Sequence, residues 1–195
     1  MIKTARAREE RAKIMLRIGI LPLDGAGELE VSETRRVVEE RFYAETRVLP
    51  EKRIPLSLFD NYRRQFLADA VLELVAEHAE NLDALVSVAG VDAYTPGLNF
   101  VFGIASSLLR ACVVFTWRLK PEFYGEPPSM ELYVSRLRKE VVHELGHVFG
   151  LKHCRTPGCV MRFSNSIRDT DAKSDKYCLK CTRKLLERGI PVRTF

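Results

Sequence analysis

The feature that most constrains this chain is an apolar stripe through residues 130–149. Apolar side chains recur there at alternating spacings of three and four, which is the period of one helix face. The stripe comprises Met130, Val134, Leu137, Val141, Leu145 and Val148. Ser129 suits an N-cap, and Gly150 permits the left-handed turn that ends many helices. The pattern predicts a core-facing helix about 30 Å long, and the remaining elements must pack around it.

Two histidines lie on the face of this predicted helix that points away from the core. At about 100° per residue, His143 and His147 are rotated roughly 200° and 240° from Val141. Glu144 stands beside them and completes the pattern HExxH. Two histidines one turn apart can bind a single zinc ion, and the adjacent glutamate is then a candidate general base. A bare HExxH also occurs by chance on polar helix faces, so the following residues matter.

Gly150 and His153 extend the pattern to HELGHVFGLKH. The glycine allows a sharp exit that returns His153 as a third nitrogen ligand and leaves the fourth zinc position for water. Three neutral histidines leave zinc its full charge, which lowers the pKa of that water from about 15.7 to about 7. Glu144 would accept a proton from this zinc-bound water and pass it to the leaving amine. The predicted reaction is hydrolysis of a peptide bond.

Four cysteines follow within 28 residues. Cys154 and Cys159 form one pair, and Cys178 and Cys181 form a CxxC pair. In the absence of a secretory signal, metal binding is favoured over disulfides, and this spacing predicts a closed, structural zinc site of four thiolates. The segment has little apolar periodicity, so the ion would supply part of its folding energy. The alternatives are a redox CxxC or free thiols. Cys112 stands alone among apolar neighbours and is expected in the core.

The charge distribution bears on nucleic-acid binding. The chain of 195 residues has a net charge of +5, but residues 1–17 contribute +4, residues 155–195 contribute +6, and residues 18–154 contribute −5. Because the basic residues belong to the two ends, a broad DNA-binding face is not expected. Apolar residues make up 46% of the chain, with no run long enough to span a membrane. We therefore expect a folded, cytoplasmic monomer with neither a membrane nor a nucleic-acid partner.

Strands and helices alternate before the long helix. Segments rich in Val, Ile and Phe predict strands at 17–23, 47–49, 85–91, 99–105 and 112–117. Helices are predicted at 32–43 and 61–78, and a loop at 120–128. This alternation is typical of an α/β layer. We expect one domain over residues 1–195, with an α/β body at 18–153 and a C-terminal segment at 154–195 stabilised by the four-cysteine site.

Three segments together resemble the archaemetzincins, a branch of the metzincin metallopeptidases. They are HELGHVFGLKHC at 143–154, CVM at 159–161 and CLKC at 178–181. The resemblance implies a mixed twisted sheet, a long active-site helix and a zinc-clamped C-terminal segment. It also implies two zinc ions per chain, one catalytic and one structural, and an edge strand near 100–105 that pairs with an extended substrate.

The resemblance assigns roles to individual residues. It implies a catalytic zinc on His143, His147 and His153, with Glu144 as base, and a structural zinc on the four cysteines. It further implies that Met161 is the methionine of a Met-turn beneath the metal, whereas the residues alone indicate only a flexible core side chain. In most metzincins this methionine lies much further from the third histidine, and the short interval here matches the archaemetzincin branch.

The leading hypothesis is a zinc metallopeptidase, a hydrolase that acts on a peptide or protein substrate. An alternative is a zinc-stabilised peptide-binding module with little or no turnover. Metal-dependent peptide binding that survives Glu144→Ala without product would favour the alternative. A third hypothesis, nucleic-acid binding through the basic tail, requires an affinity that falls steeply with salt.

Overall fold

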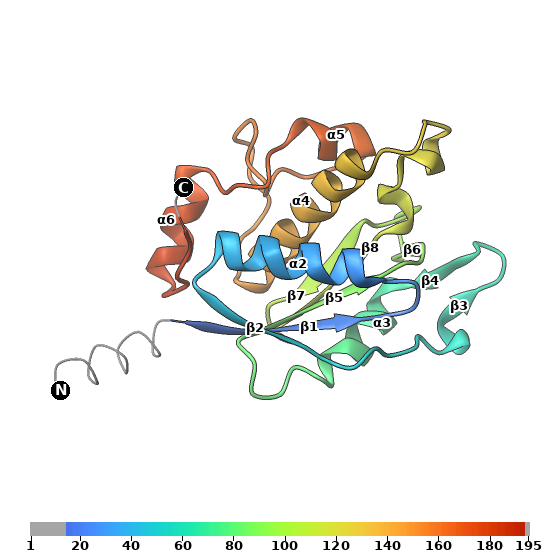
Figure 1. The fold of residues 1–195 in the computed structure, drawn as a ribbon, viewed down its shortest axis with the longest axis horizontal. Helices are drawn as coiled ribbons and strands as arrows, with labels where there is room; N and C mark the ends of the chain where they lie inside the picture. Colours follow the sequence, from blue (N-terminus) through green and yellow to red (C-terminus); the bar gives the residue numbers. More distant parts are fainter. Residues whose placement is uncertain (1–14, 194–195) are drawn as a thin grey trace, which may run out of the picture.

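The computed structural model describes residues 15–193, and its main sheet has five strands (Figure 1). In spatial order they are β2 (Ala44–Val48), β1 (Leu16–Pro22), β5 (Ala84–Ala89), β8 (Ala111–Phe115) and β7 (Gly103–Ser106). Neighbours among β2, β1, β5 and β8 are parallel, while β7 at the edge is antiparallel to β8. The predicted mixed α/β sheet is therefore confirmed. The basic N-terminal segment lies, except for its last three residues, outside the described residues.

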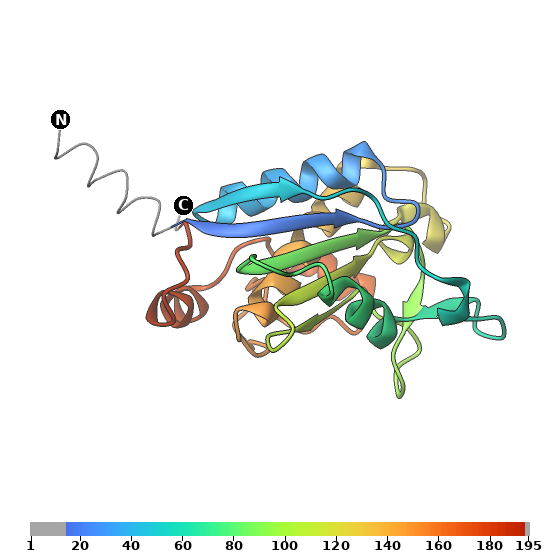
Figure 2. The ribbon, with the colours of Figure 1, turned by 90° about the horizontal axis from the view of Figure 1, so that it is seen from below.

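Helices cover both faces of this sheet. They are α2 (Glu28–Arg41) and α4 (Met130–Val148) on one face and α3 (Ala68–Ala76) on the other. Figure 2 shows α2 and α3 on opposite sides of the strands. Val86 and Val114 face α2 and α4, whereas their neighbours Leu85 and Val113 face α3. Because both faces are buried, β5 and β8 are apolar except at Ser87, whose hydroxyl donates to the Leu21 carbonyl, as the sequence pattern indicated.

A smaller sheet corrects one predicted helix. Its strands are β3 (Phe59–Asp60), β4 (Gln65–Leu67) and β6 (Ala93–Tyr94). The helix predicted at 61–78 is observed only from Ala68 as α3. The Asp60 carboxylate accepts hydrogen bonds from the backbone N–H groups of Tyr62 and Arg63, which makes a tight turn. The chain then pairs as β4 with both neighbours, so strand pairing replaces the first turns of the predicted helix.

The edge strand is shorter than predicted. Of the segment 99–105, the part from Gly103 onward pairs with β8. Upstream, the Val101 N–H donates to the Ala93 carbonyl, so the chain approaches the small sheet before it joins the main one. The predicted loop at 120–128 contains a short 3-10 helix, Pro121–Tyr124, preceded by another at Trp117–Leu119. A further 3-10 turn spans Leu56–Leu58.

The long helix α4 begins and ends as its sequence predicts. The Ser129 hydroxyl accepts a hydrogen bond from the Leu132 N–H, and the helix ends at Val148 before a left-handed Gly150. The Leu151 N–H donates to the Gly146 carbonyl, which is the bond of a Schellman motif. The stripe is buried from Leu137 onward, whereas Met130 in the first turn is exposed.

The C-terminal segment contains two helices, α5 (Ile167–Ala172) and α6 (Leu179–Glu187). It also contributes Val160, Met161, Leu185 and Val192 to the core beneath α2 and α4. Apolar packing therefore joins this segment to the body, in addition to the cysteines. No helix among the described residues combines the length and apolar character needed to cross a bilayer.

Candidate active site and cysteine cluster

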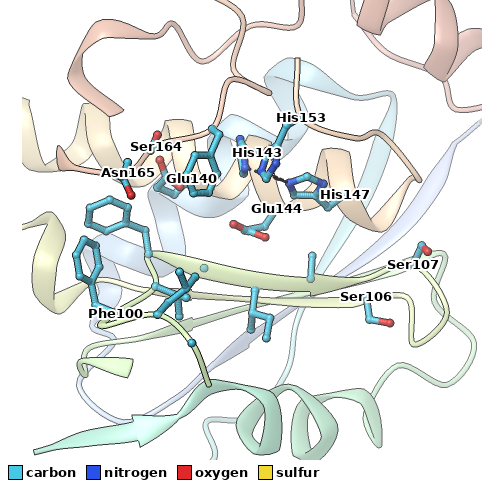
Figure 3. Close-up of a pocket in the computed structure, with 18 of the residues that line it drawn as sticks. Phe100, Ser106, Ser107, Glu140, His143, Glu144, His147, His153, Ser164 and Asn165 are labelled. Atoms are coloured by element: carbon cyan, nitrogen blue, oxygen red, sulfur yellow. Dashed lines mark hydrogen bonds between the residues drawn. The ribbon is translucent and has the colours of Figure 1, made fainter. Parts of the chain in front are cut away.

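The three predicted histidine ligands converge on one point. His143 and His147 project from successive turns of α4, and His153 comes from the loop after Gly150 (Figure 3). The Nε2 atom of His147 lies 3.1 Å from Nε2 of His143 and 3.2 Å from Nε2 of His153. His143 is buried, His147 is half-buried and His153 is exposed. The structure thus brings all three imidazoles together with their Nε2 atoms facing one another.

Backbone carbonyls fix the tautomers of two of these rings. The His143 Nδ1–H group donates to the Val160 carbonyl at 2.7 Å, and that of His147 donates to the Leu151 carbonyl at 2.8 Å. Each Nε2 atom then keeps its lone pair for a ligand. Burial is the largest cause that lowers the pKa of both histidines, for His143 well below its usual value. Burial therefore favours neutral imidazoles, which is the form that binds metals, although the hydrogen bonds to the two carbonyls partly oppose this effect.

The nitrogen set fits a zinc ion. At zinc–nitrogen distances of about 2.0–2.1 Å, two ligands of a tetrahedral site lie about 3.3 Å apart. The observed separations of 3.1 and 3.2 Å are close to that spacing. Three imidazole nitrogens at this spacing, open on one side, have the donor set and geometry of a catalytic zinc site.

Glu144 lies between the histidines and the edge of the sheet. Figure 3 shows its carboxylate below the imidazoles, toward the strand that carries Ser106. Its side chain is almost completely buried. Burial, and next the charge of Glu140, raise the pKa of Glu144 to about 8, while Lys173 opposes this rise. A cation at the three nitrogens would favour the ionised carboxylate, because an opposite charge nearby stabilises the charged form.

The exit from α4 depends on Gly150. Its φ is +83°, and a Cβ there would lie 2.5 Å from the guanidinium of Arg188. That guanidinium donates to the Phe149 carbonyl at 3.0 Å and so caps the C-terminus of α4. Glycine at position 150 is therefore favoured by its backbone conformation, and a side chain there would also displace the guanidinium of Arg188. The sharp turn then brings His153 back toward His147.

A buried ion pair lies directly behind His143. Lys173 Nζ is 2.9 Å from Glu140 Oε1 and 3.5 Å from His143 Nδ1, and its side chain is fully buried. The hydroxyl of Thr170 donates to the same Glu140 oxygen at 3.0 Å. Glu140 stands one turn before His143 on α4 and lines the cleft. These charged residues connect the C-terminal segment to the candidate active site.

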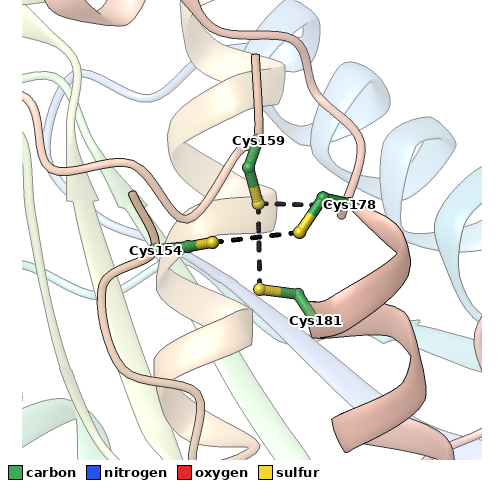
Figure 4. Close-up of side chains that lie close together, drawn as sticks. All are labelled: Cys154, Cys159, Cys178 and Cys181. Carbon is green, nitrogen blue, oxygen red and sulfur yellow. Dashed lines mark hydrogen bonds between the residues drawn. The ribbon is translucent and has the colours of Figure 1, made fainter. Parts of the chain in front are cut away.

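The four cysteines of the second cluster also converge, as Figure 4 shows. The Sγ atoms of Cys154 and Cys178 are 3.8 Å apart, and those of Cys159 and Cys181 are 3.8 Å apart. Tetrahedral zinc–sulfur bonds of about 2.3 Å place ligand sulfurs about 3.8 Å apart. The sulfurs are too far apart for disulfides, which need about 2.05 Å. Their spacing fits a tetrahedral ion.

Backbone N–H groups face some of these sulfurs. The N–H of Thr156 donates to Cys154 Sγ, and the N–H of Cys178 donates to Cys159 Sγ. Burial raises the pKa of Cys159 and Cys181. At Cys178, hydrogen bonds outweigh the opposing effect of burial and lower the pKa to about 6. A thiolate is thus favoured at one position at least, as a metal site of four sulfurs requires.

The two clusters share one short stretch of backbone. Cys154 follows His153, and its N–H donates to the Met161 carbonyl at 2.8 Å. Met161 is fully buried, and its sulfur lies so close to Gly146 that any Cβ at Gly146 would collide with it. Met161 therefore packs against the helical turn between His143 and His147. The Met-turn role that the resemblance implies for Met161 stays a prediction.

A cleft of about 820 Å³ opens between α4 and the edge strand. Its walls combine the histidines and Glu144 with the backbone of β7 and with apolar side chains. The latter include Leu98, Phe100, Phe102, Leu108 and Phe163. An unpaired strand edge offers N–H and C=O groups to an extended peptide. The cleft is large enough for several residues of a peptide chain.

Several residues of the site were not predicted from the sequence. Glu140 lies three positions before His143 on the same helix, so a helical projection could have found it. Lys173, Arg188 and Gly103 reach the site through tertiary contacts, and no local pattern marks them. The lone Cys112 is buried in the core as predicted.

Comparisons with known proteins show similarity over most of the chain. The family model of peptidase family M54 matches residues 31–187. An archaemetzincin of Thermococcus kodakarensis is 53% identical over 133 residues, which are 67% of this chain and 72% of the relative. An archaemetzincin of Methanocaldococcus jannaschii is 37% identical over 180 residues, which are 91% of this chain and 97% of the relative.

Solved structures are similar over a comparable length. The crystal structure of the archaemetzincin of Archaeoglobus fulgidus, complexed with malonate, has a TM-score of 0.76 and 36% identity, covering 87% of this chain and 99% of that one. The archaemetzincin of Methanopyrus kandleri has a TM-score of 0.77 and 36% identity, covering 89% and 95%.

Proposed function

The chain belongs to peptidase family M54, whose members are zinc metallopeptidases, and on this premise we propose that His143, His147 and His153 hold the catalytic zinc and that Glu144 is the general base. The chain is thus a hydrolase that acts on peptides, and the resemblance noted in its motifs is confirmed. A peptide-binding module without turnover is not favoured.

The convergence of three Nε2 atoms beside a buried carboxylate is the observation that carries this proposal. Zinc bound there would act as a Lewis acid on the scissile carbonyl and on a water molecule. Glu144 accepts the proton of the attacking water and delivers it to the leaving amine. The carbonyls of Val160 and Leu151 hold two imidazoles in the required orientation.

A mixed peptide library, with cleavage detected by mass spectrometry, tests the proposal. Glu144→Gln keeps the shape of the side chain but cannot accept a proton, so we expect cleavage to slow by about 10²- to 10⁴-fold. The zinc content of the variant should equal that of the wild type. Equal rates for the two zinc-loaded proteins, or the same lack of cleavage in both, would contradict the assigned role.

We further infer that Cys154, Cys159, Cys178 and Cys181 hold a structural zinc, which gives two ions per chain. The sulfur separations of 3.8 Å support this inference. We also propose that residues 1–195 act as one metallopeptidase domain, since the body and the C-terminal segment share one core cluster. Zinc analysis of the wild type should give two ions per chain. His147→Ala and Cys178→Ser should each give about one.

A further inference from the structure

Glu144 packs directly against the backbone of Gly103 in the edge strand β7. A Cβ built on Gly103 would lie 2.6 Å from Cγ, 2.6 Å from Oε1 and 2.7 Å from Cδ of Glu144. Non-bonded carbon atoms keep about 3.5–4.0 Å apart. Even a methyl group at position 103 would therefore overlap most of the carboxyl arm of Glu144, and not only its flexible end.

Both sides of this contact are held in place. Gly103 is opposite Val114 in the antiparallel pairing of β7 with β8, so the strand cannot move away without loss of ladder hydrogen bonds. Glu144 is buried on a helix whose apolar stripe is anchored in the core. By the alternation of the strand, Gly103 and Ala105 face α4 while Ile104 faces the opposite core cluster. The strand thus presents its two smallest side chains to the active-site helix.

The backbone conformation does not require glycine at this position. Gly103 lies within a regular strand, whereas Gly150 has a φ of +83° that disfavours other residues. Replacement of a glycine by alanine in an allowed conformation usually stabilises a protein slightly, because the unfolded chain loses freedom. The contact that disfavours a side chain at Gly103 is therefore its contact with Glu144.

We propose that Gly103 is a positioning residue for the general base: its missing side chain gives the Glu144 carboxylate the space it occupies between the histidines and the edge strand. The proposal rests on the proposed function of Glu144. A Cβ at position 103 would turn the carboxyl arm away from the reacting groups or push β7 outward. Displacement of a catalytic group by about 1 Å can cost about 10²-fold in rate.

The first test measures thermal unfolding and needs no substrate. Gly103→Ala should lower the Tm by about 3–8 °C in the wild-type background, as overpacking does. In a Glu144→Ala background the same substitution should leave the Tm unchanged or raise it slightly, because the obstacle is gone. Ser106→Thr adds one carbon to the same strand on its other face and serves as the matched control, with an expected shift below about 2 °C. Equal Tm losses in both backgrounds would overturn the proposal.

The second test measures kinetics on a cleaved peptide. Gly103→Ala should lower kcat by about 10- to 100-fold, with zinc content and KM within twofold of wild type. Glu144→Asp shortens the arm by one carbon, so alanine at position 103 should cost less than threefold in that background. A kcat for Gly103→Ala within twofold of wild type would refute the positioning role. If no wild-type cleavage is found, the proposed function fails, but the Tm comparison still decides whether Gly103 makes room for Glu144.

Discussion

The histidine cluster and the cysteine cluster meet at one peptide bond, since His153 belongs to the first and Cys154 to the second, but their surroundings differ. The histidines open onto a cleft of about 820 Å³, and two of them stand on a helix that the core already fixes. The sulfurs are enclosed by their own loop and by the start of α6. An open set of three nitrogens suits chemistry, and a closed set of four sulfurs suits folding.

This difference predicts opposite consequences for the loss of each ion. The cysteine segment should lose its order, whereas the histidine site should lose activity and little stability. The clusters are nevertheless coupled, because the Val160 carbonyl that orients His143 follows Cys159 directly. Any change that loosens the cysteine loop should weaken zinc binding at the histidine site. Linkage makes the coupling reciprocal, but a tightly bound structural ion should remain in place when the histidine site is lost.

The largest effect is expected for Cys178→Ser. Structural zinc supplies about 10–16 kcal/mol in isolated zinc fingers, and loss of a third of that should lower the Tm by about 8–16 °C. Loss of the outer support of His143 should also weaken catalytic zinc binding by about 10- to 100-fold. Calorimetry measures the change in Tm, and zinc titration measures the change in catalytic zinc affinity. Cys112→Ala, outside both clusters, is the control and should keep both ions. Unchanged stoichiometry in Cys178→Ser would contradict a structural site.

A second large effect is expected for Lys173→Met, which tests the connection between the C-terminal segment and α4. The substitution leaves the Glu140 carboxylate buried without its ion-pair partner and should cost about 3–5 kcal/mol of unfolding free energy. The double variant with Glu140→Gln should recover about 2 kcal/mol. The exposed Lys184→Met serves as the control. A loss below about 1 kcal/mol in denaturant unfolding would show that the pair contributes little.

The sequence predicted the parts of the site that are local. The apolar stripe of α4, the HExxH spacing and Gly150 all belong to one helix and its exit. Local sequence patterns are therefore enough to predict how these residues are arranged. The paired cysteines are equally visible, because ligand spacing is a property of the chain. Lys173 is different: it reaches His143 only because α5 packs on α4, and no periodic pattern records that contact.

Tertiary contacts also explain where the predicted elements were wrong. Residues 65–67 have helical spacing with those that follow, but pairing with β3 and β6 makes them a strand. The C-terminal segment has little periodicity, yet Leu185 and Val192 complete the core of the body. A segment that fills gaps left by other elements needs no regular apolar pattern of its own. Its packing cannot be read from its sequence alone.

A third prediction concerns Asp175, which holds the cysteine segment to the body independently of zinc. Its carboxylate accepts bonds from Arg41 at 2.8 and 2.9 Å and from Arg138 at 3.0 Å. Asp175→Asn should cost about 2–3 kcal/mol at neutral pH. The exposed Glu73→Gln is the control, and denaturant unfolding measures both variants. If Asp175→Asn loses no more unfolding free energy than Glu73→Gln, Asp175 does not hold the segment to the body.

The same carboxylate predicts a pH dependence. Burial tends to raise the pKa of Asp175, but the hydrogen bonds and charges of Arg41 and Arg138 outweigh it and lower the pKa. The stabilisation is therefore complete above the unfolded pKa of about 3.9 and is lost as the pH falls through the lower folded value. The difference in unfolding free energy between wild type and Asp175→Asn should shrink over that range. A difference that stays constant down to the lowest pH would exclude an ionised Asp175 as its source.

The smallest effect on stability, and the sharpest contrast with Cys178→Ser, is expected for His147→Ala. The variant loses a catalytic ligand and the bond from Nδ1 to the Leu151 carbonyl, which is worth about 1 kcal/mol. The stripe of α4 stays buried whether or not an ion is bound, so the Tm measured without added zinc should fall by only about 2–4 °C. One ion per chain should remain, bound by the cysteines. If both ions are lost, or if the Tm falls as far as in Cys178→Ser, the histidine site is also a folding site, and the contrast between the two clusters is wrong.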